Sequence, residues 1–261
     1  MTGSATAVLH VNSLSKSFGG IQAVSDVSFD VGKGELLALI GPNGAGKTTC
    51  FNMLMGQLKP SSGQVFLNGE DITGMAPRKV WRKGVGRTFQ ITGTYPSMTV
   101  IENIQMALIS HHKRLFSIKP YATRLYRDEA MSLLELVGMP GQADRASAIL
   151  AYGDLKRLEL AIALCHEPTL LLMDEPTAGM APRERINLMK LTADIVSDRN
   201  ISVLFTEHDM DVVFAHAHRV MVLNRGELIA NGSVQDIRDN STVQDVYLGG
   251  GSLFASGETH A

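Results

Sequence analysis

A glycine-rich run near the N-terminus contains the residue types that bind phosphate. The run is Gly41, Pro42, Asn43, Gly44, Ala45, Gly46, Lys47, Thr48 and Thr49, which matches the pattern GxxxxGK[ST]. Glycines let backbone N–H groups converge on phosphate oxygens, and the start of a following helix adds the positive end of its dipole. Lys47 is expected to reach the β- and γ-phosphates, and the Thr48 hydroxyl to ligate Mg²⁺. The run therefore predicts a nucleoside triphosphate site.

Two adjacent carboxylates follow a second apolar run. Leu170 to Met173 lead directly into Asp174 and Glu175. Burying a charge at the end of a strand that is covered on both faces costs free energy, so the pair of carboxylates indicates a catalytic or metal-binding role. Asp174 can hold Mg²⁺ beside Thr48, and Glu175 can polarise the attacking water as a general base.

Gln90 and His208 also follow predicted strands, Val85–Phe89 and 201–205. The carboxyl ends of parallel strands gather ligand groups at one rim of a sheet. There His208 could donate a hydrogen bond to the γ-phosphate, and Gln90 could contact Mg²⁺ or the water. A lone histidine can equally be structural or solvated, so position alone leaves both interpretations of His208 open.

The elements around these residues alternate between strands and helices. Apolar runs predict buried strands at 36–40, 170–173 and 201–205, with a helix from the glycine-rich run to about Gly56. Asn68-Gly69 after Val65–Leu67 predicts a hairpin, and residues 8–11 and 24–31 alternate as edge strands do. Between about 98 and 138 the pattern is helical. The fold class is therefore α/β, with an antiparallel part and a helical insertion.

Composition limits the classes of function. The 261 residues carry 24 basic and 26 acidic side chains, a net charge of −2, which gives no electrostatic case for nucleic-acid binding. No apolar run approaches the ~18–20 residues that span a bilayer, and no signal peptide is visible. Cys50 and Cys165 are expected to be buried free thiols of a reducing compartment. These features indicate a cytosolic protein and leave docking onto a membrane protein open.

In their order and spacing, these motifs resemble the ATP-binding subunit of ABC transporters over nearly all of residues 8–248. The resemblance implies a P-loop NTPase (RecA-like) core, residues 1–90 and 159–248, with an antiparallel β subdomain. It also implies an inserted helical subdomain, 91–158. The tail from Gly249 is rich in glycine and serine, which predicts disorder. Phe18 falls where the family stacks an aromatic ring on adenine. Gln90 matches the Q-loop glutamine that couples nucleotide to the membrane partner, and His208 matches the switch histidine.

The signature motif and the D-loop depart from the family pattern. Ala151, Tyr152, Gly153 and Asp154 occupy the signature position that normally follows leucine as SGGQ. Losing the serine hydroxyl puts its contact with the γ-phosphate of the opposite subunit in doubt. Ala181 stands where the D-loop usually ends in aspartate. Pairing with a different ATPase subunit would tolerate such changes, so homodimer and heterodimer both stay open.

Finer features resemble the subunits that power branched-chain amino-acid uptake, or uptake of urea and other amides. They are the run Gly86–Gln90, the basic and aromatic insertion at 111–127, the altered signature and the C-terminal Val246–Gly249. The insertion is either a solvated arm or a partner surface. The resemblance implies ATP and Mg²⁺ as cofactors and a second ATPase subunit and membrane permeases as partners. It also implies a solute-binding protein as an indirect partner, and a peripheral location on the inner face of the membrane.

Three other functions use the same phosphate-binding loop. A soluble ABC ATPase for chromosome maintenance would need coiled-coil insertions, and there are no sustained heptads here; one for cluster assembly would lack a permease. A small-molecule kinase would need an arginine-bearing lid and an acceptor site. A nucleotide sensor without turnover would not need Glu175 and His208. The expected function is therefore ATP hydrolysis that drives a membrane importer.

Overall fold

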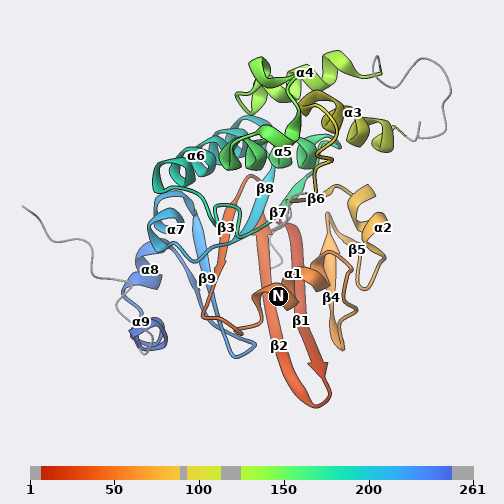
Figure 1. The fold of residues 1–261 in the computed structure, drawn as a ribbon. Helices are drawn as coiled ribbons and strands as arrows, with labels where there is room; N and C mark the ends of the chain where they lie inside the picture. The colour runs from red at the N-terminus through yellow and green to blue at the C-terminus, as the bar shows by residue number, and fades with distance from the viewer. Residues whose placement is uncertain (1–6, 89–92, 113–124, 249–261) are drawn as a thin grey trace, which may run out of the picture.

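The computed structural model describes residues 7–88, 93–112 and 125–248 (Figure 1). Its strands are β1 (Ala7–Phe18), β2 (Ile21–Gly32), β3 (Leu36–Ile40), β4 (Ser62–Leu67), β5 (Glu70–Asp71), β6 (Val85–Thr88), β7 (Leu170–Asp174), β8 (Ser202–Thr206), β9 (Arg219–Asn224) and β10 (Glu227–Gly232). Its α-helices are α1 (Lys47–Leu54), α2 (Pro77–Arg82), α3 (Val100–His111), α4 (Arg127–Leu136), α5 (Tyr152–Leu164), α6 (Pro182–Arg199), α7 (Met210–His216), α8 (Val234–Arg238) and α9 (Ser241–Leu248). Short 3₁₀ turns lie at Pro140–Gln142 and Ser147–Ile149.

The strands form two sheets. An antiparallel sheet has the order β2-β1-β4-β5, and a six-stranded sheet has the order β10-β9-β3-β8-β7-β6. In the second sheet β3 pairs in parallel with both β8 and β9, and β7 pairs in parallel with β8 and β6. The predicted class, α/β with an antiparallel part, is therefore confirmed. The hairpin predicted at Asn68-Gly69 joins β4 and β5.

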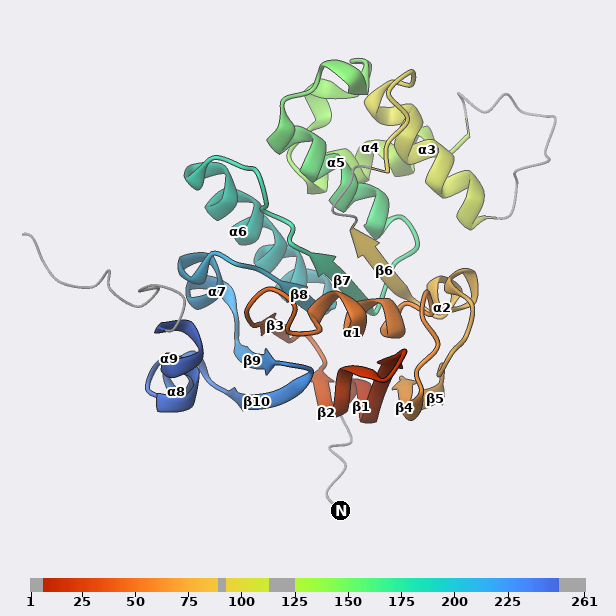
Figure 2. The ribbon, with the colours of Figure 1, turned by 60° about the horizontal axis from the view of Figure 1, so that its bottom comes forward.

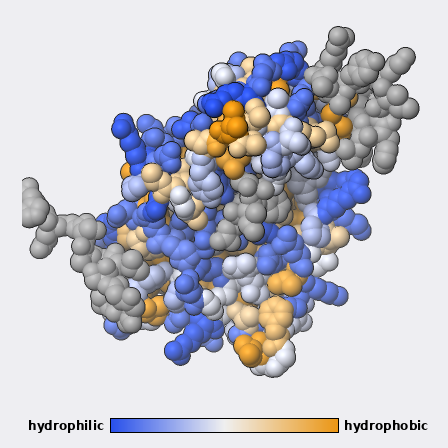
Figure 3. Space-filling view, in the orientation of Figure 1, coloured by the Kyte–Doolittle hydropathy of each residue, from blue (hydrophilic) through white to orange (hydrophobic). Residues whose placement is uncertain are grey.

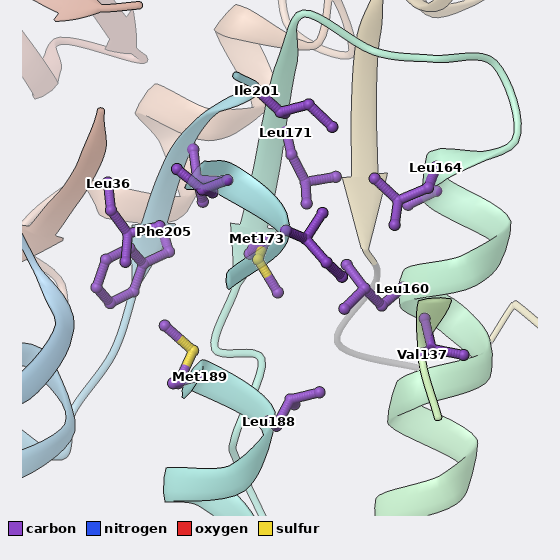
Figure 4. Close-up of a cluster of buried hydrophobic side chains, with 14 of the residues drawn as sticks. Leu36, Val137, Leu160, Leu164, Leu171, Met173, Leu188, Met189, Ile201 and Phe205 are labelled. Carbon is purple, nitrogen blue, oxygen red and sulfur yellow. The ribbon is translucent and has the colours of Figure 1, made fainter. Parts of the chain in front are cut away.

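Successive residues of the central strands enter two separate cores. Leu36, Ala38 and Ile40 of β3 pack with the helices α3 to α7, whereas Leu37 and Leu39 pack with α1 and the antiparallel sheet. This follows from the two-residue period of a strand, since both faces of the sheet are covered. Figure 4 shows the first core, where Phe205 and Met173 from the sheet meet Leu160 and Leu188 from the helices. Figure 2 shows α1 between the two sheets.

Helices α3, α4 and α5 pack on one another and form a separate helical layer at the top of Figure 1. Thr99 caps α3 through a capping box with Glu102, which fixes where this layer begins. Gly138 has φ +71 and follows Val137, the C-cap residue of α4, as is common where a helix ends. Cys50 and Cys165 are free and buried, as expected. Among the described residues, no helix has the length and apolarity to span a bilayer.

Candidate functional site

The glycine-rich run connects β3 to α1 in a backbone conformation that requires glycine. Gly46 has φ +105, and a Cβ there would lie 2.4 Å from the carbonyl oxygen of Ala23. A Cβ on Gly41 would lie 2.1 Å from the carbonyl oxygen of Leu223. Since β2 and β9 crowd the loop this closely, a side chain at either position would displace it. The loop is therefore held against two strands and leads directly into α1.

Lys47 is the first residue of α1 and is only 7% exposed. Its Nζ donates hydrogen bonds to the carbonyl oxygens of Gly41 (2.6 Å) and Pro42 (3.2 Å). Burial lowers the pKa of Lys47, and the nearby carboxylates of Glu175 and Asp174 oppose that shift. The Lys47 ammonium group is thus bound by the carbonyl oxygens of the loop and lies near the Asp174 and Glu175 carboxylates.

Asp174 is the last residue of β7 and pairs in register with Thr206, the last residue of β8. The fully buried Thr206 hydroxyl donates to Asp174 Oδ1 at 2.7 Å. The Arg87 guanidinium lies 3.6 Å from Asp174 Oδ2, and both side chains are less than a tenth exposed. Asp174 is therefore a buried carboxylate whose direction is fixed from two neighbouring strands.

Glu175 sits at the turn that leaves β7, with φ +48, a conformation that few non-glycine residues adopt. Its N–H donates to the Thr206 backbone oxygen (3.2 Å) and hydroxyl (3.0 Å), which holds this backbone in place. Glu175 Oε1 lies 2.8 Å from His208 Nε2, in hydrogen-bond contact. The structure therefore brings the expected general base and the expected switch histidine together.

These groups surround a cavity of about 210 Å³. It is lined by Ala23, the residues Asn43 to Thr49, Glu175 and His208. The cavity is thus lined by a glycine-rich loop, a lysine, two threonines, a glutamate and a histidine, the residue types that a triphosphate site requires. Gln90, expected on the same rim, lies outside the described residues.

The residues at the signature position begin α5 in the helical layer. Ala151 is the N-cap residue and Tyr152 is 43% exposed, with Lys156 Nζ 5.5 Å from its ring centroid. Gly153 lies against Glu184, and Asp154 accepts a hydrogen bond from Gln142 at 3.3 Å. Of the described residues, none from Ala151 to Asp154 lines the cavity of about 210 Å³. One chain therefore does not bring its own signature residues into the phosphate site.

Comparisons with known proteins agree with this geometry. The model of the ABC transporter family matches residues 24–178. The branched-chain amino acid transport ATP-binding protein BraF of Pseudomonas aeruginosa is 40% identical over 249 residues, which is 93% of this chain and 98% of that protein. The corresponding protein LivG of Escherichia coli is 40% identical over 252 residues, with the same coverage of both chains. A solved ATP-binding cassette of an ABC transporter, in its ADP conformation, has a TM-score of 0.84 and 30% identity, covering 93% of this chain and 99% of the other.

The chain belongs to the ABC transporter family. It is an ATP-hydrolysing subunit of that family with the P-loop fold expected from its motifs. The ABC match covers the glycine-rich loop and the Asp174-Glu175 pair, whereas the cavity residues Ala23 and His208 lie just before and beyond it.

Phe18 ends β1 at the tip of the β1–β2 hairpin of this ABC subunit. It is 45% exposed, and the neighbouring Ile21 is 74% exposed. Apolar groups at the lower end of the face in Figure 3 coincide with this tip. Lys16 Nζ lies 5.1 Å from the Phe18 ring centroid. The ring does not line the phosphate cavity itself, and its open face is available to a flat apolar group.

Three residues at this ABC site were not assigned from sequence. Arg87 and Thr206 contact Asp174, and Glu207 accepts hydrogen bonds from Thr177. Glu207 directly precedes His208 in the sequence and belongs to none of the motifs described above. The position of Glu207 at the end of an apolar strand could have indicated its role, because a buried carboxylate requires hydrogen-bond donors around it.

Proposed function

We propose that this chain closes head to tail with a second ATPase subunit, a copy of itself or a related chain, around two ATP molecules. In this arrangement each ATP lies between the glycine-rich loop of one subunit and the signature residues of the other. The observation that carries the proposal is the cavity that holds Lys47, Glu175 and His208 but excludes the chain's own signature residues. ATP would then form part of the interface, and its hydrolysis would remove those contacts.

Magnesium fits the donors on this rim. The Thr48 hydroxyl and the Asp174 carboxylate are oxygen ligands, which Mg²⁺ prefers, and we assign both to it together with the Gln90 side chain. When bound, the ion neutralises charge on the β- and γ-phosphates. Asp174 is already directed by Thr206 and Arg87, so little side-chain ordering remains to be done on binding.

The hydrolytic step uses this chain's own groups. Lys47 exchanges the carbonyl oxygens of Gly41 and Pro42 for phosphate oxygens, which keeps its ammonium paired. Glu175 accepts the proton of the attacking water, and His208 hydrogen-bonds the γ-phosphate while its ring stays in reach of Glu175. Phe18 stacks on the adenine, and the N–H groups from Asn43 to Thr49 hold the phosphates.

We further propose that the subunit drives import of branched-chain amino acids or related small solutes. The support is its similarity, over nearly the whole chain, to proteins named for branched-chain amino-acid transport. The partners are membrane permeases, contacted through the Gln90 region, and indirectly a solute-binding protein. The subunit then lies on the inner face of the membrane through its permease.

Substitution of Glu175 tests the site. Glu175→Gln should keep ATP binding but reduce turnover by at least about a hundred-fold, because the amide cannot accept the proton of the water. The variant, its natural partner subunit, ATP and Mg²⁺ should give a stable pair by small-angle scattering. Glu167→Gln is the control, since this exposed carboxylate lies beyond the other end of β7. Normal turnover in Glu175→Gln would refute its role as base.

A transport assay tests the solute. Vesicles that contain the permeases and both ATPase subunits should take up labelled leucine only with ATP and the solute-binding protein. Uptake of urea in place of leucine would assign the chain to amide import.

A further inference from the structure

The strongest unassigned feature near the site is a buried carboxylate, Glu207. It is 3% exposed and directly follows β8. It accepts three hydrogen bonds: from the Thr177 N–H (2.8 Å), the Thr177 hydroxyl (2.7 Å) and the His208 N–H (3.2 Å). Burial raises the pKa of Glu207, and the hydrogen bonds from Thr177 and His208 oppose that shift. An apolar side chain would fill this position at lower cost, so the carboxylate indicates a role beyond packing.

The donors to Glu207 lie on the two segments that carry the reactive groups. Thr177 is two residues after Glu175, and His208 is the residue whose ring contacts Glu175. One carboxylate therefore binds the main chain of both segments. Because Glu175 has an unfavourable φ of +48, its segment needs such external bonds to keep its conformation.

Further bonds join the same two segments on either side of Glu207. Thr206 bonds Asp174 and the Glu175 N–H on one side. On the other side, Arg185 Nη1 donates to Asp209 Oδ2 at 2.7 Å, and its Nε donates to the Met180 oxygen at 2.8 Å. Each residue from Thr206 to Asp209 thus makes a hydrogen bond to a residue in the segment from Asp174 to Arg185. Of these side chains, Glu207 is the one that accepts main-chain N–H groups from both segments, at Thr177 and at His208.

We propose that Glu207 is a positioning residue that binds the Glu175 segment to the His208 segment and so holds the two side chains in the geometry for hydrolysis. The proposal rests on the catalytic roles proposed above for Glu175 and His208. Glu207 itself does not line the cavity of about 210 Å³, and it acts only through the backbone that it holds.

Substitutions at Thr177 separate the hydrogen bond from packing. Thr177→Val keeps the shape of the buried side chain (1% exposed) but removes the hydroxyl donor, whereas Thr177→Ser keeps the donor and removes a methyl group. Thr177→Val should lower kcat about ten-fold with the KM for ATP within two-fold, and Thr177→Ser should retain most of the kcat. Thr192→Val is the matched control, because this buried hydroxyl donates to the Leu188 oxygen of its own helix α6 and has no other hydrogen bond among the described residues. A greater loss in Thr177→Ser than in Thr177→Val would assign the effect to packing and overturn the proposal.

A double-mutant cycle tests whether Glu207 acts through His208. Glu207→Gln alone should lower kcat about ten-fold, since the amide cannot accept from both Thr177 and His208. In the His208→Ala background, Glu207→Gln should cause less than a two-fold further loss. Independent, multiplicative losses would overturn the proposal. If Glu175→Gln and His208→Ala lose turnover but Thr177→Val and Glu207→Gln keep it, the proposed role of Glu207 is wrong and the proposed site stands. If Glu175→Gln and His208→Ala keep full turnover, the proposed catalytic site is itself refuted.

Discussion

At the scale of single residues, the side chains that react were predictable, whereas those that hold them were not. Lys47, Thr48, Asp174 and Glu175 belong to patterns whose spacing has one chemical explanation. Thr206 could not be predicted in this way. A threonine at the end of an apolar strand has no distinctive spacing, and its role depends on the register that pairs it with Asp174. The positioning residues therefore emerge only from the order of the strands.

Phe18 allows a prediction about a residue at the edge of the site. Phe18→Ala should raise the KM for ATP about ten-fold and leave kcat within two-fold, because stacking on a base contributes roughly 1–3 kcal/mol to binding and does not involve the phosphates. Ile21→Ala is the control at the same hairpin tip, where the side chain is even more exposed. Steady-state kinetics over a range of ATP concentrations measure both constants. A fall in kcat without a change in KM would show that the ring has another role.

At the scale of elements, the type and order of the strands were predictable, but the buried face of α5 was not. Leu155, Leu158, Ile162 and Cys165 recur at helical spacing, which predicts one buried stripe, yet Leu155 and Ile162 are only partly buried. Lys156 and Glu159 are buried instead, paired at 3.1 Å. The physical reason is that α5 contacts β6, α3, α4 and α6, so it has no single apolar face. In α6, the spacing of Ile186, Met189, Ala193 and Val196 also predicts a buried stripe. Ile186 is nevertheless 54% exposed, because the start of α6 projects beyond the sheet (Figure 1).

The end of α5 provides a prediction about pH. His166 is 8% exposed, and its ring centroid lies 4.6 Å from that of Trp81. Burial lowers the pKa of His166 to about 4, and His111 adds to this shift. The unfolded chain, with a pKa of about 6.5 at this residue, therefore takes up the proton first as the pH falls. The contribution of His166 to stability is complete above pH 6.5 and is lost progressively towards pH 4, by about 3 kcal/mol in total.

His166→Leu should remove this pH dependence. Urea unfolding between pH 7 and pH 4 should show a smaller loss of unfolding free energy in the variant than in the wild type. His112→Leu is the control and should follow the wild type, because this exposed ring lies just beyond the end of α3. Parallel curves for His166→Leu and the wild type would mean that the pKa of His166 is the same in the folded and unfolded chains.

At the scale of the whole molecule, the phosphate cavity and the signature helix belong to different layers of the fold. The cavity lies beside α1, and α5 begins in the helical layer (Figures 1 and 2). The sequence resemblance indicated that these two regions serve different nucleotides, but composition and periodicity alone could not, because they do not specify how distant elements are placed. Because the cavity and the signature residues are separated within one chain, the function of the signature residues has to be tested in the assembled pair of subunits.

A substitution at Ala151 tests whether the signature residues contact the ATP of the partner subunit. Ala151 is the N-cap of α5, and within the described chain its side chain makes no capping hydrogen bond. Ala151→Ser should cap α5 and stabilise the fold by about 1 kcal/mol. If the signature meets the partner's ATP, the new hydroxyl should also make the ATP-dependent pair several-fold tighter. That affinity is measured by scattering in the Glu175→Gln background with the natural partner subunit present.

Ala76→Ser is the matched control for capping. Ala76 is the exposed N-cap of α2 and also has no side-chain capping bond among the described residues. Both serines should raise the melting temperature by similar amounts, because each supplies the same missing acceptor to a helix start. Only Ala151→Ser should change pairing, since α2 lies away from the start of α5 in both ribbon views (Figures 1 and 2). Equal effects of the two serines on pairing would mean that the signature residues do not touch the nucleotide across the interface, and the sandwich arrangement would then be wrong for this subunit.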